Sequence, residues 1–361
     1  MVDFWFNHFN VFSGKGLDDV WIGNYEQQAI RPFALGRFRD LLFAATKHPA
    51  MLVYLDNALS TAPGSTGARG RQKGLNENFA REVMELHTLG ANGGYTQEDV
   101  VTLARVLTGW GVNQPNARAF PEHAAVFEGA RHDYSPKVFL GHPLQSRGKA
   151  EGEEALDILA HSPATAHHIA FELAQYFVAD EPPPPLVERL AGRFLATGGD
   201  IREVLKVLFT SSEFLESYNR KYKTPYHFVV SAARAAGVPV NNTRPLLAAI
   251  SQLGMPLFGC LTPDGYKNTE AAWLSPDATT RRISFATAFA RGALPVGSIP
   301  SDPARGASDS TVPLRTNPVD AAHLQKIFGS TITEPTREAI AEAPQALRAA
   351  LILGGPDFMR R

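Results

Sequence analysis

Apolar residues recur at helical spacing along most of the chain. The first clear pattern follows Pro32 and consists of Phe33, Leu35, Phe38, Leu41, Leu42 and Ala45. A short helix is expected from Pro49 to about Asn57, and two more are expected from Glu77 to Leu89 and from Thr96 to Gly109, where glycines end the pattern. The same spacing predicts helices over 151–161, 163–178, 185–196, 200–217, 224–236, 243–253, 279–291, 319–328 and 336–352.

Residues 112–145 break this pattern, because His, Pro and Gly fall between short apolar pieces such as Val138-Phe139-Leu140. We expect a long loop excursion there, with one small β-hairpin near 120–140. Long alternating segments are absent, so the predicted class is all-α, an irregular array of many helices. The predicted regions are 1–145, a helical region that carries a polar motif; 146–291, a second helical region; 292–318, a linker rich in Pro, Gly and Ser; and 319–361, C-terminal helices that pack back.

Composition narrows the function classes only slightly. The chain has 361 residues, a formal net charge of −1 and one cysteine. Such a neutral balance gives no reason to expect a nucleic-acid partner, and no apolar stretch approaches the roughly 18 residues of a membrane span. Cys260 alone excludes an intrachain disulfide and a multi-cysteine metal site. The chain starts without a recognisable signal peptide, and its localisation stays open.

The densest polar stretch runs from Asn76 to Gly90. At about 100° per residue, Asn78, Arg81, Glu82 and Glu85 share one helical face, and the apolar residues and His87 lie on the other. Glutamates at i, i+3 suit an acid–base couple or a pair of metal ligands. The alternative is a solvated polar face with one core histidine.

Two further stretches carry candidate chemistry. In Phe4-Trp-Phe-Asn-His-Phe-Asn10, four aromatic residues surround His8, which is either a metal ligand or base, or a hydrogen-bonded residue of a packed helix. In the excursion, His132 and Asp133 are adjacent, and neighbouring side chains diverge in an extended chain. They therefore predict two separate contributions or an Asx-type turn rather than a dyad.

Common cofactor motifs are missing from the sequence. It contains no phosphate-binding loop, no His-Glu-x-x-His, no Gly-x-Ser-x-Gly and no glycine fingerprint after a strand. We therefore expect no nucleotide, flavin or haem cofactor, whereas a divalent metal stays possible.

These motifs together resemble the bacterial domain-of-unknown-function 1800 family. The resemblance rests on Asn76–Gly90, on Gly94-Tyr-Thr-Gln, Leu107-Thr-Gly-Trp and His48-Pro-Ala-Met-Leu-Val-Tyr-Leu-Asp56, on His132-Asp with Lys137, and on Pro263-Asp-Gly-Tyr266. It covers essentially the whole chain and implies a mainly helical fold without an established activity. Family members usually continue upstream of the Asp3-Phe-Trp-Phe motif, so an N-terminal segment, and with it an export signal, is expected to be missing here. The aromatic residues at the start are then expected to expose apolar surface.

Two functions follow from these observations. The first is an enzyme with a polar cleft, hydrolytic or metal-assisted, with an unidentified small-molecule or protein partner. Its acid–base residues would be Glu82, Glu85, His132 and Asp133, its binding residues Asn7, Asn76, Asn78, Arg81 and His87, and its metal ligands His8, Glu82 and Glu85. Arg81 would clamp an anionic group. The alternative is a non-catalytic scaffold or partner-binding protein in which the same residues form a buried polar network.

Overall fold

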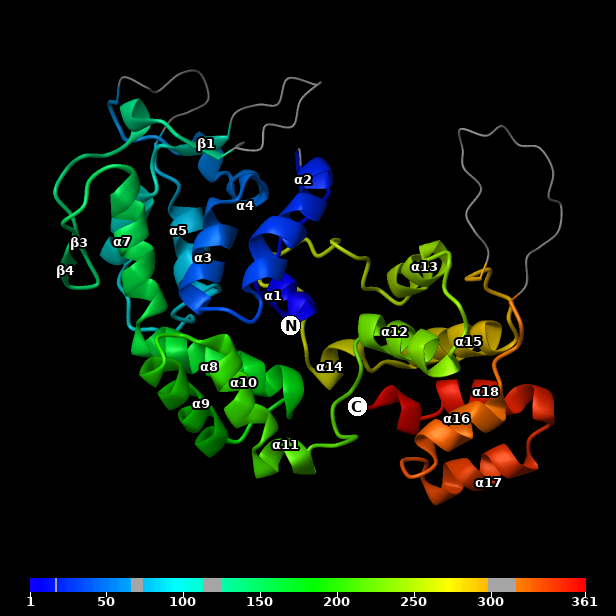
Figure 1. The fold of residues 1–361 in the computed structure, drawn as a ribbon. Helices are drawn as coiled ribbons and strands as arrows, with labels where there is room; N and C mark the ends of the chain where they lie inside the picture. The colour runs from blue at the N-terminus through cyan, green and yellow to red at the C-terminus, as the bar shows by residue number, and fades with distance from the viewer. Residues whose placement is uncertain (17, 66–73, 113–124, 298–315) are drawn as a thin grey trace, which may run out of the picture. The chain divides into compact units, whose positions relative to one another are not determined.

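Helices dominate the computed structural model, which describes residues 1–16, 18–65, 74–112, 125–297 and 316–361. The described residues form eighteen α-helices and two small antiparallel sheets (Figure 1). The all-α prediction is therefore confirmed. No helix in the described ranges combines the length and the apolar character needed to cross a bilayer. Part of the predicted linker, residues 298–315, and the first residues of the predicted hairpin region lie outside the description.

Clustering of contacts divides the chain into two compact units. The N-terminal unit comprises Met1–Phe177, Glu181–Leu215 and Phe258–Tyr266, and the C-terminal unit comprises Val178–Asp180, Glu216–Leu257 and Lys267–Arg361. Each unit therefore contains segments that are distant in sequence. The division into regions at residues 145, 291 and 318 stays a prediction.

The N-terminal unit contains the polar motif. Its helices are α1 (Val2–His8), α2 (Asp18–Tyr25), α3 (Phe38–Lys47), α4 (Pro49–Tyr54), α5 (Glu77–Glu85), α6 (Gln97–Val106), α7 (Lys149–Ala160), α8 (Pro163–Phe177), α9 (Pro184–Ala196) and α10 (Ile201–Phe209), with α11 (Ser212–Glu216) at its edge. In Figure 1, α8, α9 and α10 lie side by side, as their contacts require.

Aromatic side chains form the centre of this unit. Trp5, Phe9 and Phe38 are fully buried, and the rings of Trp5 and Phe38 lie 5.8 Å apart. The Trp5 indole donates a hydrogen bond to the carbonyl oxygen of Ala34 at 3.0 Å. The expectation that the first aromatic residues expose apolar surface is therefore wrong for Phe4, Trp5 and Phe9, because α1 is covered by residues of this same chain.

Two short sheets occur in the predicted excursion. Strand β1 (Trp110–Val112) pairs with β2 (Ala125–Phe127), and β3 (Val138–Phe139) pairs with β4 (His142–Pro143). The β3–β4 hairpin turns at Leu140 and Gly141, both with positive φ, as a tight two-residue turn requires. A small hairpin in this region is thus confirmed.

The C-terminal unit has its own apolar core. It contains α12 (Pro225–Ala236), α13 (Arg244–Gln252), α14 (Glu270–Trp273), α15 (Pro276–Ala290), α16 (Ala321–Phe328), α17 (Glu334–Glu342) and α18 (Gln345–Gly354). Helices α15 and α18 make the most extensive contact, and Phe228, Phe289 and Leu353 lie in the core. Burial of such side chains supplies the main driving force for folding.

Candidate functional site

Helix α5 begins with the amide of Asn76. Its side-chain oxygen accepts a hydrogen bond from the backbone N–H of Phe79 at 3.0 Å, so Asn76 caps the helix. Its side-chain N–H₂ group donates to the carbonyl oxygen of Leu55 at 2.7 Å and so ties α5 to the end of α4. Asn76, predicted to bind a ligand, therefore has both polar atoms engaged by this chain, whereas Asn78 is exposed.

Glu85 and Arg81 lie on the predicted polar face and are paired with neighbours. The Glu85 carboxylate accepts a hydrogen bond from the Tyr95 hydroxyl and lies 3.4 Å from Nη1 of Arg81. Arg81 also donates to the side-chain oxygen of Gln97 at 2.6 Å. The Arg81 guanidinium is therefore occupied by protein groups on α5 and α6.

Glu82 behaves differently from its neighbours on the same face. Its side chain is partly buried, and its carboxyl group has no hydrogen bond or ion pair among the described residues. Burial raises the pKa of Glu82, and the negative charges of Glu85 and Asp264 raise it further, against a smaller opposing effect of Arg81. Glu82 is thus a carboxyl group held among like charges.

Asp264 comes from a remote segment, Phe258–Tyr266, that packs into the N-terminal unit. Asn7, a predicted binding residue on α1, holds this segment: its side chain accepts from the N–H of Tyr266 at 2.7 Å and donates to the carbonyl of Tyr266 at 2.8 Å. Gly265 has φ +66°, and a Cβ there would lie 2.2 Å from the Asn7 carbonyl oxygen, so only glycine fits. The segment is therefore fixed next to α1, and Asp264 lies close enough to Glu82 to raise its pKa.

His8 uses both ring nitrogens for contacts with this chain. Its Nδ1 lies 2.5 Å from the Glu172 carboxylate on α8, and its Nε2 lies 3.2 Å from the carbonyl oxygen of His87. Both partners are hydrogen-bond acceptors of this chain. His8 therefore bridges α1, α8 and the end of α5.

His87 lies beyond the last residue of α5, which ends at Glu85 rather than at Leu89. Its side chain is fully buried, and neither ring nitrogen has a hydrogen-bond partner in the described part of the chain. Burial lowers the pKa of His87 well below its usual value, and the nearby His8 and His168 lower it further. His87 is therefore neutral and lies away from Glu82, on the apolar side that the sequence predicted.

His132 belongs to a closed ionic network. Its Nε2 lies 3.0 Å from the Glu151 carboxylate, and its Nδ1 lies 2.9 Å from the carbonyl oxygen of Thr108. The Lys137 ammonium donates to the same Glu151 oxygen at 3.0 Å, and at most 1% of each of these three charged side chains is exposed. The other Glu151 oxygen, Oε1, has no hydrogen-bond partner among the described residues and lies 3.9 Å from Nη1 of Arg147.

Asp133 points away from its neighbour His132. Its Oδ1 accepts hydrogen bonds from the backbone N–H of Ser135 at 2.8 Å and from the Ser135 hydroxyl at 2.5 Å, which is an Asx turn. The two adjacent residues thus make separate contributions, as their extended backbone predicts. They form no dyad.

The structure does not bring the proposed metal ligands together. His8 faces Glu172, whereas Glu82 faces Asp264 and Glu85. A metal-binding histidine must leave one nitrogen for the metal, and both nitrogens of His8 and of His132 face acceptors of this chain. Within the described ranges, no three His, Cys, Asp or Glu side chains are grouped as metal ligands.

Sequence reasoning missed three carboxylates at these positions. Glu151 lies in an acidic run that is typical of a solvated helix start, and Glu172 follows two histidines on α8 without a distinguishing pattern. Asp264 lies in the Pro263-Asp-Gly-Tyr266 piece of the resemblance, which was the only indication of its importance. None of the three contacts is local in sequence, so periodicity did not reveal them.

Comparison with known proteins gives a single match. A family model described as "Protein of unknown function (DUF1800)" matches residues 1–360. Searches of curated proteins and of solved structures found no match to the chain.

Proposed function

The chain belongs to the DUF1800 family of proteins of unknown function, and we propose that it carries a general acid–base site on α5. In this site the carboxyl group of Glu82 donates a proton to the substrate and takes one up again. The observation that carries this proposal is the position of Glu82, partly buried beside the carboxylates of Glu85 and Asp264 and without a hydrogen-bond or ion-pair partner among the described residues. Carboxyl groups with a raised pKa near a second carboxylate are typical of acid–base centres.

A purely structural role does not explain this arrangement. Repulsion between like charges and loss of hydration both oppose folding, so an unpaired carboxylate beside two others lowers stability. Three other polar residues of the motif, Asn76, Arg81 and Glu85, avoid that cost because each has a partner in this chain. Destabilising charge arrangements persist where a function requires them.

The chemistry of the carboxylates limits the reaction and the substrate. With its raised pKa, Glu82 can donate a proton to a leaving group, and Asp264 or Glu85 as a carboxylate can accept a proton from an attacking water. This favours hydrolysis of a substrate that is neutral or positively charged, since an anion would be repelled by the negative charges of Glu85 and Asp264. The His8 and His132 networks then serve as supports that hold α1, α6, α7 and α8 around α5.

Glu82→Gln tests this proposal, with Glu98→Gln on the exposed face of α6 as the matched control. Chromogenic neutral glycosides and esters serve as probes, and thermal melting is measured on the same samples. We expect Glu82→Gln to abolish hydrolysis and to leave the melting temperature unchanged or higher, because it removes repulsion. A melting temperature several degrees lower for Glu82→Gln than for Glu98→Gln would show that Glu82 supports the fold instead.

A second candidate is a non-catalytic scaffold or partner-binding protein. It is favoured by the network of His132, Lys137 and Glu151, in which at most 1% of each side chain is exposed. The same measurement distinguishes the two functions. If Glu82→Gln is as destabilising as removal of the Glu151 charge, the whole polar motif is structural.

A further inference from the structure

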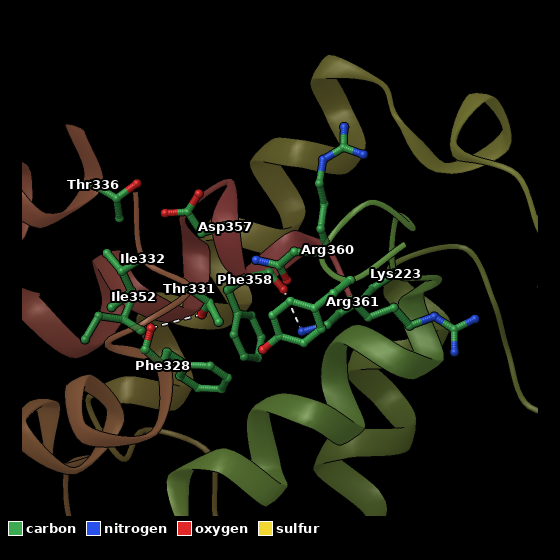
Figure 2. A pocket seen from close by; sticks show the side chains of 12 residues that line it. Lys223, Phe328, Thr331, Ile332, Thr336, Ile352, Asp357, Phe358, Arg360 and Arg361 are labelled. Atoms are coloured by element: carbon green, nitrogen blue, oxygen red, sulfur yellow. Dashed lines mark hydrogen bonds between the residues drawn. The ribbon is translucent and has the colours of Figure 1, made fainter. Parts of the chain in front are cut away.

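A pocket of about 180 Å³ lies within the C-terminal unit, far in sequence from the polar motif. Figure 2 shows its lining, which comes from the ends of α16 and α18, the start of α17 and the segments that flank α12 and follow α18. Much of the wall is apolar and includes Phe328, Ile332, Ile352 and Phe358. A cavity near 150 Å³ with such walls holds a benzene-sized molecule.

Lys223 provides the charged group of this pocket. Its side chain is buried, and its ammonium donates to the carbonyl oxygen of Phe358 at 2.7 Å, drawn as a dashed line in Figure 2. The same nitrogen lies 3.7 Å from the centre of the Phe358 ring. An ammonium carries three donors, and among the described residues this one has no second hydrogen bond and no carboxylate partner.

The surroundings of Lys223 add positive charge rather than neutralising it. Burial, with smaller contributions from the charges of Arg361 and Arg282, lowers the pKa of Lys223 to about 7. Arg282 is buried beside it, and its Nε and Nη1 have no hydrogen-bond partner in the described structure. Buried cations without an anionic partner are costly, and no carboxylate of the described residues pairs with Lys223 or Arg282.

Two other charged residues of the pocket, Arg360 and Asp357, have partners in this chain. Arg360 makes two hydrogen bonds with Glu270, at 2.6 and 3.0 Å. Asp357 accepts hydrogen bonds from the backbone N–H and the hydroxyl of Thr333, and in Figure 2 it lies on the Thr336 side of the pocket. Neither residue neutralises Lys223.

We propose that this pocket binds a small organic carboxylate with an apolar, ring-sized body. The carboxylate pairs with Lys223 and supplies the missing negative charge, and the body lies against Phe328, Ile352 and Phe358. The volume accommodates a single aromatic ring with a short acidic arm and is too small for a nucleotide or a long acyl chain. This binding site is independent of the acid–base site on α5.

Calorimetry with the whole protein tests the proposal. Phenylacetate is the probe, phenylacetamide is its uncharged match, and acetate lacks the apolar body. We expect phenylacetate to bind at pH 6 at least tenfold more tightly than either comparison compound. Lys223→Met should remove this preference, whereas Lys326→Met on the exposed face of α16 should leave it unchanged.

A pH series on the unmodified protein gives an answer that does not depend on folding of the variant. Between pH 6 and pH 8.5 an arginine side chain does not lose its proton, and His227, with a pKa of about 3, stays neutral. The other charged side chains near Lys223 are Arg282, Arg360, Arg361 and Asp357. Phenylacetate binding should therefore weaken severalfold over this range as Lys223 loses its proton. Absence of phenylacetate binding at millimolar concentration, equal binding of the amide, or affinity independent of pH would each overturn the proposal.

Discussion

Two carboxyl groups of the N-terminal unit, those of Glu151 and Glu82, have opposite electrostatic surroundings. These surroundings determine whether each group stabilises or destabilises the fold. Glu151 is fully buried and has the basic side chains of His132, Lys137 and Arg147 as neighbours, whereas Glu82 has two carboxylates as neighbours. Sequence patterns identified Glu82 and left Glu151 in what looked like a solvated run. The reason is that helical periodicity assigns a face to a residue but does not reveal the partner that a distant element brings to it.

Glu151→Gln should be strongly destabilising. The substitution leaves the buried Lys137 ammonium and the His132 ring without their anionic partner, and breaking a buried pair costs about 3–5 kcal/mol. Glu153→Gln, two residues along on α7, is the control, because its partner Lys47 and Glu153 itself are partly exposed and such a pair contributes less than about 1 kcal/mol. Urea unfolding of the two variants measures the difference, and equal losses would contradict the closed network.

Asp18→Asn should stabilise the protein at high pH. Asp18 is fully buried, and neither carboxyl oxygen has a hydrogen-bond partner among the described residues. Burial raises its pKa to about 8; Lys15 opposes the shift, and Asp19 and Asp56 add to it. A raised carboxyl pKa means that stability falls as pH rises from about 4 to about 8. We expect Asp18→Asn to raise the melting temperature by several degrees at pH 8 and little at pH 4.5, with exposed Asp19→Asn as the control that shows no such difference.

At the scale of elements, helix existence was predictable and helix ends were less so. The predicted helix over 336–352 is two helices, because Pro344 forces Ala343 into an extended conformation between α17 and α18. The predicted helix over 200–217 also divides, where the Ser211 hydroxyl accepts a hydrogen bond from the N–H of Phe214 at 3.2 Å. Both helix breaks are caused by local residues, Pro344 and Ser211, which can be recognised in the sequence. The early end of α5, in contrast, depends on the tertiary packing of His87.

The start of α6 gives a prediction at this scale. Thr96 and Asp99 form a capping box, as the sequence indicated, and Asp99 Oδ1 also accepts from the N–H of Leu140 in the β3–β4 turn at 2.9 Å. Thr96→Ala removes the hydrogen bond that its hydroxyl accepts from the N–H of Asp99 and the one it donates to the Asp99 carboxylate, and it should cost about 1 kcal/mol. Asp99→Ala removes the carboxylate half of the capping box and the tie to the hairpin, and we expect about twice that loss in urea unfolding. An equal loss for the two variants would mean that the contact with Leu140 contributes nothing.

Buried histidines make the stability of the whole molecule depend on pH. Burial lowers the pKa of His48 to about 4 and of His227 to about 3, and it lowers the pKa of His87 and His168 as well. Between about pH 4 and pH 6.5 the unfolded chain therefore binds protons that the folded chain does not, and stability rises with pH. Asp18 and Glu82 act in the opposite direction, but the four histidines outnumber them.

We therefore expect the urea midpoint to rise from pH 4.5 to pH 6.5. His48→Asn should flatten this dependence, because asparagine does not titrate and is still able to cap α4 as His48 does. His142→Asn, at an exposed position of β4, should leave the dependence unchanged. A midpoint that falls with pH would show that the buried carboxyl groups dominate.

The path of the chain between the two compact units bears on its synthesis. The N-terminal unit includes Phe258–Tyr266. The backbone carbonyl oxygens of this segment accept hydrogen bonds from the side chains of Asn7, Asn10 and Tyr54. During translation this segment is synthesised more than two hundred residues after Asn7 and Asn10. The hydrogen bonds of these two side chains with the segment therefore cannot form until most of the chain has been made. A fragment cut after Leu257 would lack this last piece and Asp264 with it, whereas a fragment cut after Tyr266 would retain both.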